Sequence, residues 1–262
     1  MDLHLSGKTA LVTGASKGIG LAIVRALVAE GITVVAGART TTPELAALAD
    51  AGRVHPVNVD LGTPDGPGTL VEAGTAVLGG RLDILVNNVG GVRPRVGGFL
   101  SVTDDDWLET LTINFLAAVR TTRAALPALV ESGGSIVTVN SVNSSLPDPL
   151  VIDYSAAKAA LANFSKSLSK EVGPRGVRVN TISPGPVETD LWLGAGGVAE
   201  TVGGANNLLP AEVARGAVSG TATGRFTRPE EVADLVLLLA GGRARNVTGA
   251  DIVIDGGLIP TI

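Results

Sequence analysis

The sequence contains no cysteine, and it has few histidines and no concentration of charge of one sign. Without cysteine the chain can form no disulfide, thiolate nucleophile or sulfur-ligated metal site. Its two histidines, His4 and His55, are too few for a histidine-rich metal site. The net charge of −5 and the absence of a Lys/Arg block argue against nucleic-acid binding, which needs a concentrated positive face. We therefore predict no metal centre and no nucleic-acid partner.

The sequence also predicts neither a secretory signal nor a membrane-spanning helix. Met1 to Lys8 lead into a strand without the basic and apolar regions of a secretory signal. No uninterrupted apolar stretch reaches the length of a membrane-spanning helix. We therefore expect a cytoplasmic protein with no membrane partner.

Glycine and aliphatic residues are abundant. Along the chain, segments with the apolar pattern of strands alternate with segments of helical spacing. Runs rich in Val and Ile predict seven strands, at residues 9–13, 33–36, 54–59, 82–86, 135–139, 177–182 and 251–254. Helical spacing follows between them, for example at residues 19–29, 104–129, 155–172 and 229–239. This alternation predicts one α/β domain over residues 1–262, a doubly wound Rossmann fold whose seven-stranded parallel sheet has helices on both faces.

The stretch from Glu188 to Phe226 fits the alternation poorly. It is rich in glycine, weakly periodic and long, and it lies between the sixth strand and the next clear helix. Loops of this length in a compact domain are often lids over a binding site. We therefore predict a substrate lid at residues 188–226.

A glycine-rich loop with the spacing G-x-x-x-G-x-G joins the first strand to the first helix. Glycines let the backbone turn sharply and approach a pyrophosphate, which the free N–H groups of a helix N-terminus can bind. A tight turn that uses glycine only for packing is the alternative. The residues predicted to bind a dinucleotide here are Gly14, Ser16, Lys17, Gly18, Ile19 and Gly20.

The end of the second strand bears on the choice between NAD and NADP. Enzymes that prefer NAD usually place Asp or Glu there to bind the ribose 2′-hydroxyl. This chain has Ala38 followed by Arg39. Arg39 and Lys17 would pair with a 2′-phosphate, unless Arg39 is simply a solvated surface residue. We predict NADP(H) in preference to NAD(H).

Tyr154 and Lys158 are four residues apart on one face of a predicted helix, and Tyr154 is the only tyrosine in the chain. A nearby ammonium lowers the pKa of a phenol, which would let Tyr154 exchange a proton with a carbonyl oxygen. A packed tyrosine beside an exposed lysine is the alternative. Ser141 ends the fifth strand and is expected to hold the substrate oxygen. Asn114 is expected either to anchor a water that links Lys158 to solvent or to be a packed helix-interior residue.

Taken together, these residues resemble the short-chain dehydrogenases/reductases over essentially the whole chain. The matching segments are Thr13–Gly20, Asp60-Leu61, Asn87–Gly90, Asn114, Ser141, Tyr154–Lys158, Pro184–Val187 and Thr189. The resemblance implies that the adenine contacts Asp60 and Leu61 and that the rest of the cofactor contacts Asn87, Asn88, Val89, Gly90, Tyr154 and Lys158. It also implies that the nicotinamide end lies against Pro184, Gly185, Val187 and Thr189. Val89 stands where the family commonly has Ala, which should only adjust the packing.

The predicted function is NADP(H)-dependent reduction of a ketone to a secondary alcohol, or the reverse, with Asn114, Ser141, Tyr154 and Lys158 as the catalytic residues. One alternative is a 3-oxoacyl-thioester reductase, for which Arg93, Arg95, Arg120 and Arg123 would dock an acyl carrier. The Tyr-x-x-x-Lys spacing resembles the ketoreductase branch more than the enoyl-reductase branch. A catalytically silent nucleotide-binding sensor is a second alternative, although such a protein would have no need of the Ser-Tyr-Lys set.

The substrate and the assembly are less well defined by the sequence. Ser141, Asn143 and Trp192 are the candidate substrate contacts, and with Val142, Leu146 and Leu191 they suggest a small, largely apolar molecule. Core packing or lid closure would explain the apolar members equally well. The resemblance implies a homodimer or homotetramer that pairs through the helices containing Asn114 and Lys158. Alanines at positions 156, 157, 159, 160 and 162 suit close helix packing.

Overall fold

The computed structural model describes residues 1–261, which form a parallel sheet of seven strands. The strands are β1 (Thr9–Thr13), β2 (Thr33–Ala38), β3 (Val54–Asn58), β4 (Ile84–Asn87), β5 (Ser135–Val139), β6 (Arg178–Pro184) and β7 (Asp251–Ile254). Their order in the sheet is β3-β2-β1-β4-β5-β6-β7. The strand order reverses between β1 and β4, and ligands of such sheets bind beyond the carboxyl ends of the strands at that point.

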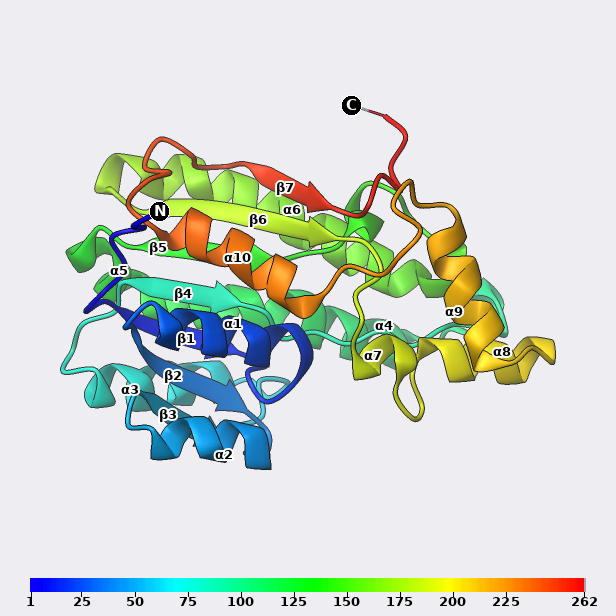
Figure 1. Ribbon diagram of the computed structural model, residues 1–262, viewed down its shortest axis with the longest axis horizontal. Helices are drawn as coiled ribbons and strands as arrows, with labels where there is room; N and C mark the ends of the chain where they lie inside the picture. Colours follow the sequence, from blue (N-terminus) through cyan, green and yellow to red (C-terminus); the bar gives the residue numbers. More distant parts are fainter. Residues whose placement is uncertain (262) are drawn as a thin grey trace.

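Helices cover both faces of the sheet. The main ones are α1 (Gly18–Ala29), α2 (Pro43–Asp50), α3 (Gly66–Val77), α4 (Asp104–Leu111), α5 (Ala117–Ser132), α6 (Ile152–Val172) and α10 (Pro229–Ala240). Figure 1 shows α1 and α10 in front of the sheet, with α6 behind it. Shorter helical turns are η1 (Phe99–Ser101), η3 (Val142–Ser144), η4 (Pro149–Val151) and η5 (Gly173–Arg175). None of the helices within residues 1–261 is both long enough and apolar enough to cross a bilayer.

Alternating side chains of the strands supply two separate cores. Ala10 and Val12 of β1 pack in a core with residues of α1 and α10, whereas Leu11 packs with residues of α3 and α5. This division arises because successive residues of a strand point to opposite faces of the sheet. Both faces are covered, so most strand positions are apolar, as the Val- and Ile-rich runs had indicated. The prediction of a doubly wound α/β fold is confirmed.

The helix predicted at 104–129 is confirmed as an unbroken helical stretch, which runs on to Ser132 and contains a π turn. The structure has α4, then a π-helical turn η2 (Thr112–Leu116), then α5. A π turn takes up an extra residue without changing the apolar pattern enough to be recognised in the sequence, and such turns are frequent at functional sites. Asn114, one of the predicted catalytic residues, lies within this π turn.

The stretch 188–226 is helical in large part, which the sequence analysis did not predict. It contains α7 (Asp190–Leu193), α8 (Val198–Asn206) and α9 (Pro210–Ser219), which lie beyond the carboxyl ends of the strands (Figure 1). Pro210 begins α9, and the Glu212 carboxylate accepts a hydrogen bond from the Leu209 N–H at 2.8 Å. Both are ordinary helix-start signals, but the many glycines around them obscured the helical period.

Candidate active site

The hydroxyl of Thr13, buried at the end of β1, joins the two central strands at their carboxyl ends. It accepts hydrogen bonds from the N–H groups of Asn88 and Val89 at 2.9 and 3.1 Å, and it donates to the Val86 carbonyl at 3.3 Å. The side-chain amide of Asn88 donates to the carbonyls of Thr13 and Gly14, both at 3.0 Å. These bonds fix the glycine loop over the ends of β1 and β4. The sequence had singled out Asn88 for the cofactor but had given Thr13 no role.

Close packing of the loop on itself explains why glycine is needed there. A Cβ atom on Gly20 would lie 2.1 Å from the Gly14 carbonyl oxygen. Gly18 has a φ of +52°, and a Cβ there would lie 3.2 Å from the Thr189 side chain. Thr189 belongs to the segment predicted to hold the nicotinamide end. The structure therefore brings this segment against the predicted pyrophosphate loop.

The N-terminus of α1 is open to an anion. Its N-cap residue, Lys17, makes no side-chain capping bond within residues 1–261, whereas α2 is capped by the Thr42 hydroxyl, which accepts from the Leu45 N–H at 3.4 Å. The first N–H groups of an uncapped helix need an acceptor, and a phosphate supplies one. The loop and helix start thus fit the pyrophosphate of a dinucleotide.

The adenosine end of the predicted site has Arg39 and Lys17, whereas enzymes that prefer NAD have an Asp or Glu at the end of the second strand. Ala38 ends β2 and is buried, and the side chains of Arg39 and Lys17 are both exposed. The Asp60 carboxylate accepts a hydrogen bond from the Gly62 N–H at 2.8 Å, and Leu61 is packed in the core with α3 and α5. The donors present at this edge fit a 2′-phosphate.

Four predicted catalytic residues come together beyond β4 and β5. The Lys158 ammonium lies 5.6 Å from the centroid of the Tyr154 ring and donates a hydrogen bond to the Val139 carbonyl at 3.0 Å. Gly90 lies between Lys158 and Asn114, since a Cβ on Gly90 would be 2.8 Å from Asn114 Oδ1 and 3.7 Å from Lys158 Nζ. Ser141 begins η3 and its hydroxyl interacts with the Tyr154 phenol.

The expected lowering of the Tyr154 pKa is wrong for the protein by itself. Burial raises the pKa of Tyr154, and the interaction with Ser141 opposes this rise only in part. Burial also lowers the pKa of Lys158 to about 8. Low-dielectric surroundings disfavour the charged form of each group, so the pKa of the tyrosine rises and that of the lysine falls. The phenol therefore stays protonated at neutral pH.

Asn114 is held by backbone groups rather than facing solvent. Its side chain accepts from the Gly91 N–H at 3.0 Å and donates to the carbonyls of Gly91 and Thr110 at 2.9 and 3.1 Å. The residue is 1% exposed. These bonds tie the segment after β4 to the π turn. They match the packed interpretation of Asn114, and its predicted role in a water relay stays a prediction.

The candidate substrate residues lie on two segments. The Ser141 hydroxyl donates to Asn143 Oδ1 at 3.1 Å and accepts from the Asn143 N–H at 3.2 Å, so Asn143 orients the Ser141 hydroxyl. Trp192 of α7 packs edge-on against Phe226, with ring centroids 5.7 Å apart. This contact joins the two ends of the predicted lid.

Other predicted residues have mainly structural contacts. The Asn87 side chain is buried and donates to the Thr122 hydroxyl of α5 at 3.0 Å, which connects β4 to its covering helix. Val187 forms an isolated bridge with Thr227, and this bridge holds the segment from Pro184 to Thr189 beside the sheet. In the described part of the chain, residues 1–261, no cluster of His, Asp and Glu could hold a metal ion.

The prediction that Arg95 belongs to a surface cluster that docks an acyl carrier is wrong. Its side chain is 11% exposed and pairs with Asp106 and Asp153, so it is not available on the surface. Sequence analysis missed this pairing because Arg95 and Asp153 are 58 residues apart and no pattern connects them. An aspartate directly before Tyr154 was the one available clue.

The fold and the site together define a dinucleotide-binding α/β protein equipped for proton exchange at a substrate oxygen. Residues 14–259 match a family described as Enoyl-(Acyl carrier protein) reductase. The chain is 33% identical over 262 residues to the 3-oxoacyl-[acyl-carrier-protein] reductase of Thermotoga maritima, covering 98% of this chain and 100% of that one. It is 31% identical over 259 residues to the Escherichia coli enzyme of the same name, with 98% and 99% coverage.

Solved structures show the same likeness. The L-sorbose reductase of Gluconobacter frateurii, in complex with NADPH and L-sorbose, superposes with a TM-score of 0.91 at 32% identity and complete coverage of both chains. A dehydrogenase/reductase from Sinorhizobium meliloti superposes with a TM-score of 0.86 at 33% identity, covering 98% of this chain and 97% of that one. The chain belongs to the short-chain dehydrogenase/reductase family, and the predicted oxidoreductase class is confirmed.

Proposed function

We propose that this protein is an NADP(H)-dependent oxidoreductase that reduces the carbonyl group of a small molecule to a secondary alcohol, or catalyses the reverse reaction. The observation that carries the proposal is the convergence of Ser141, Tyr154 and Lys158 beside the uncapped start of α1. The relatives named for 3-oxoacyl-thioester and L-sorbose reduction, the latter with NADPH bound, support it.

The residues of the chain have distinct tasks in this reaction. The Ser141 hydroxyl, oriented by Asn143, binds the substrate carbonyl oxygen, and Tyr154 donates the proton to that oxygen. Lys158 holds the ribose hydroxyls, and Asn114 completes a path for proton replacement. NADPH supplies the hydride when bound. The raised pKa of Tyr154 suits reduction, because that direction requires the phenol as a proton donor at neutral pH.

Segment 188–226 is part of this proposal as the lid over the substrate. The apolar side chains of Leu191, Leu193, Leu208 and Leu209 are 40% or more exposed on α7 and around α9. Exposed leucines concentrated beyond the carboxyl ends of the strands would be covered if the lid closed on a substrate. The single-domain organisation over residues 1–262 and the cytoplasmic location remain predictions.

A homodimer or homotetramer is the proposed assembly. Ala156 and Ala159 are exposed on α6, and β7 is an edge strand whose side chains are partly exposed. A shallow hollow of about 430 Å³ lies between them and is lined in part by Ala162, Lys166 and Asp251. Small side chains and an open sheet edge suit a contact with a second copy.

The alternative is reduction of a 3-oxoacyl thioester, which is the activity named for several relatives. With Arg95 buried, only Arg93, Arg120 and Arg123 of the predicted docking cluster remain as contacts for an acidic carrier. Oxidation of NADPH is to be followed with a ketose, simple ketones, quinones and a 3-oxoacyl thioester, each with and without an acyl carrier protein. Turnover of a ketose or ketone but no thioester selects the first proposal, and no turnover of any carbonyl compound refutes both.

A further inference from the structure

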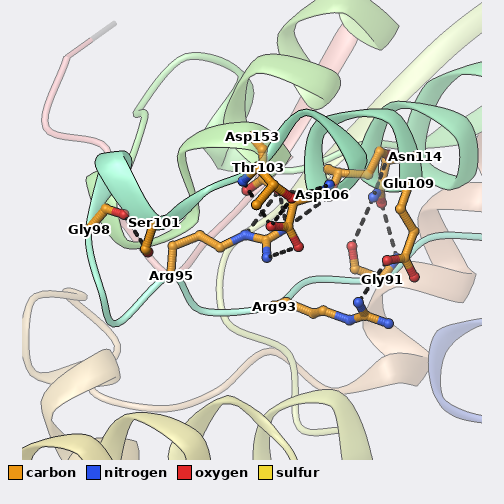
Figure 2. A network of polar contacts seen from close by, with 11 residues as sticks. Gly91, Arg93, Arg95, Gly98, Ser101, Thr103, Asp106, Glu109, Asn114 and Asp153 are labelled. Atoms are coloured by element: carbon orange, nitrogen blue, oxygen red, sulfur yellow. Dashed lines mark hydrogen bonds and ion pairs between the residues drawn. The ribbon is translucent and has the colours of Figure 1, made fainter.

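A buried ion-pair cluster lies directly behind the proposed proton donor. It contains Arg95 from the segment between β4 and α4, Asp106 and Thr110 from α4, and Asp153 from α6; we call it the Arg95 cluster. Figure 2 shows the Arg95 guanidinium reaching between Asp106 and Asp153. The side chains of Arg95 and Asp153 are only 11% and 2% exposed. The pair therefore belongs to the interior and is not an ordinary surface ion pair.

The guanidinium joins three separate parts of the chain. Arg95 Nε and Nη2 donate to Asp153 Oδ2 at 3.1 and 2.5 Å, and Nη1 donates to Asp106 Oδ1 at 2.8 Å. The Thr110 hydroxyl donates to the same Asp153 oxygen at 2.7 Å. A planar guanidinium with several fixed donors sets the relative orientation of its partners, which a single ammonium cannot do as well.

The cluster acts on the start of the helix that carries Tyr154. Asp153 directly precedes Tyr154 in the first turn of α6. The backbone N–H of Arg95 donates to the Leu150 carbonyl at 2.6 Å, just before the helix begins. Val151 at the N-cap provides no side-chain cap within the described residues 1–261. The 3₁₀ turn η4 that leads into α6 is capped by Asp148, whose carboxylate accepts from the Leu150 N–H at 2.9 Å. The Arg95 cluster adds to this local cap a link between the first turn of α6, α4 and the segment after β4.

At its other end, the segment between β4 and α4 contacts Asn114 and lies beside Lys158. Gly90 lies between Asn114 and Lys158, and Gly91 forms two hydrogen bonds with the Asn114 side chain. A segment fixed at Gly91 and at Arg95 thus connects Asn114, Lys158 and the first turn of α6. A shift at Arg95 would move the Tyr154 hydroxyl relative to Ser141.

We propose that Arg95 is a positioning residue, which fixes the first turn of α6 through Asp153 and so sets Tyr154 against Ser141 for proton transfer. The inference rests on the proposed function in taking Tyr154 as the proton donor. A purely structural ion pair is the competing explanation. It would change the stability of the protein without changing the surroundings of the tyrosine in the folded state.

The chain offers a direct probe of this difference, because Tyr154 is its only tyrosine. Ultraviolet absorbance of the tyrosinate as a function of pH therefore reports the ionisation of Tyr154 alone. Burial raises the pKa of Tyr154, so loosening the first turn and admitting water should lower it toward the value of a free phenol. Lys158 on the same helix is the neighbouring titrating group, and it should lose most of its charge before the tyrosine ionises.

The test compares Arg95→Met and Arg95→Lys with the control Arg81→Met. Arg81 also pairs with a buried aspartate, Asp83, at 2.6 Å, but this pair lies directly before β4 and so at the opposite end of the strand from the site. We expect Arg95→Met to lower kcat by about tenfold to hundredfold, the effect of a small misplacement of a reacting group, with little change in the KM for NADPH. We also expect a lowered tyrosine pKa, partial recovery of both properties in Arg95→Lys, and a wild-type kcat and tyrosine pKa in Arg81→Met.

Loss of Arg95 leaves the Asp153 carboxylate, which is 2% exposed, in the interior without its cationic partner, which can prevent folding. The double variant Arg95→Met/Asp153→Asn removes the buried charge together with its partner and serves if the single variant does not fold. A folded variant with the wild-type kcat and an unchanged tyrosine titration would overturn the inference. If the wild-type protein reduces no carbonyl compound, the proposed function fails, but the tyrosine titration still decides whether Arg95 positions Tyr154.

Discussion

The Lys158 ammonium lies 5.6 Å from the centroid of the Tyr154 ring and donates its hydrogen bond to the Val139 carbonyl. Lys158 is buried and Tyr154 is partly buried, and burial raises the pKa of Tyr154 and lowers the pKa of Lys158, which favours the neutral form of each. The arrangement favours a tyrosine that donates a proton. It also gives the lysine a pKa close to the physiological range.

Tyr154→Phe should abolish most of the activity while leaving the fold intact. The substitution removes the hydroxyl that donates the proton and keeps the ring, so kcat should fall by about 10²–10⁴-fold. NADPH binding, measured by cofactor fluorescence, and the circular dichroism spectrum should stay close to wild type. Near-normal turnover in this variant on a substrate that the wild type reduces would contradict the assigned role of Tyr154.

Lys158→Met should inactivate the enzyme but make it more stable at neutral pH. Burial lowers the pKa of Lys158 from 10.5 to about 8, so below pH 8 the folded protein has a buried ammonium that the unfolded chain exposes to water. Above that pH the unfolded chain binds more protons than the folded one, and the stability of the wild type rises relative to the variant.

Urea denaturation of both proteins between about pH 7 and pH 10 checks this expectation. The advantage of Lys158→Met in free energy of unfolding should be largest at the acid end and shrink toward the alkaline end. Lys170→Met is the matched control, since Lys170 is an exposed lysine of the same helix. An advantage that did not change with pH would show that the lysine is not desolvated.

Arg39→Ala should narrow the preference for NADPH over NADH. Losing one charge-assisted hydrogen bond to the 2′-phosphate costs about 1.5–3 kcal/mol, which corresponds to roughly tenfold or more in the ratio of specificity constants. Arg25→Ala, which replaces an exposed arginine on α1, should leave the ratio unchanged. Equal use of both cofactors by the wild-type enzyme would refute the predicted selectivity.

Trp192→Ala should weaken substrate binding more than cofactor binding. Trp192 packs on Phe226 with the ring centroids 5.7 Å apart, and their contact joins the two ends of segment 188–226. Losing an aromatic pair of this kind removes about 0.5–1.5 kcal/mol beyond the buried area, so the lid should close less completely. A raised KM for the carbonyl substrate with an unchanged Kd for NADPH is the expected result. An unchanged KM would argue against the lid.

The mass in solution tests the proposed assembly. Pairing through α6 or the edge strand β7 should give a dimer or tetramer of the 26.3 kDa chain at micromolar concentration. Ala159→Arg, which places a long charged side chain on the exposed face of α6, should shift the protein toward the monomer if α6 forms the contact. A wild-type protein that is entirely monomeric would disprove the assembly.

Most of the architecture was determined by local sequence patterns. Buried parallel strands must be apolar on both faces, so the Val- and Ile-rich runs located β1 and β5 with their observed ends. The ends of the edge strand β7 were also predicted, although its side chains are partly exposed. The glycine loop was equally readable, since a Cβ on Gly20 would collide with the Gly14 carbonyl. The spacing of Tyr154 and Lys158 placed them on one face of a helix because of the helical period.

The tertiary structure alone decided the features that depend on distant contacts. The pKa of Tyr154 rises because burial depends on everything packed around the phenol, which the four-residue spacing to Lys158 could not reveal. The bonds between Asn114 and Gly91 and the pairing of Arg95 with Asp153 join segments far apart in the chain. Local patterns therefore determined which residues were predicted to form the site. Long-range packing determined the surroundings of Tyr154 and Lys158 and the ion pairs beside them.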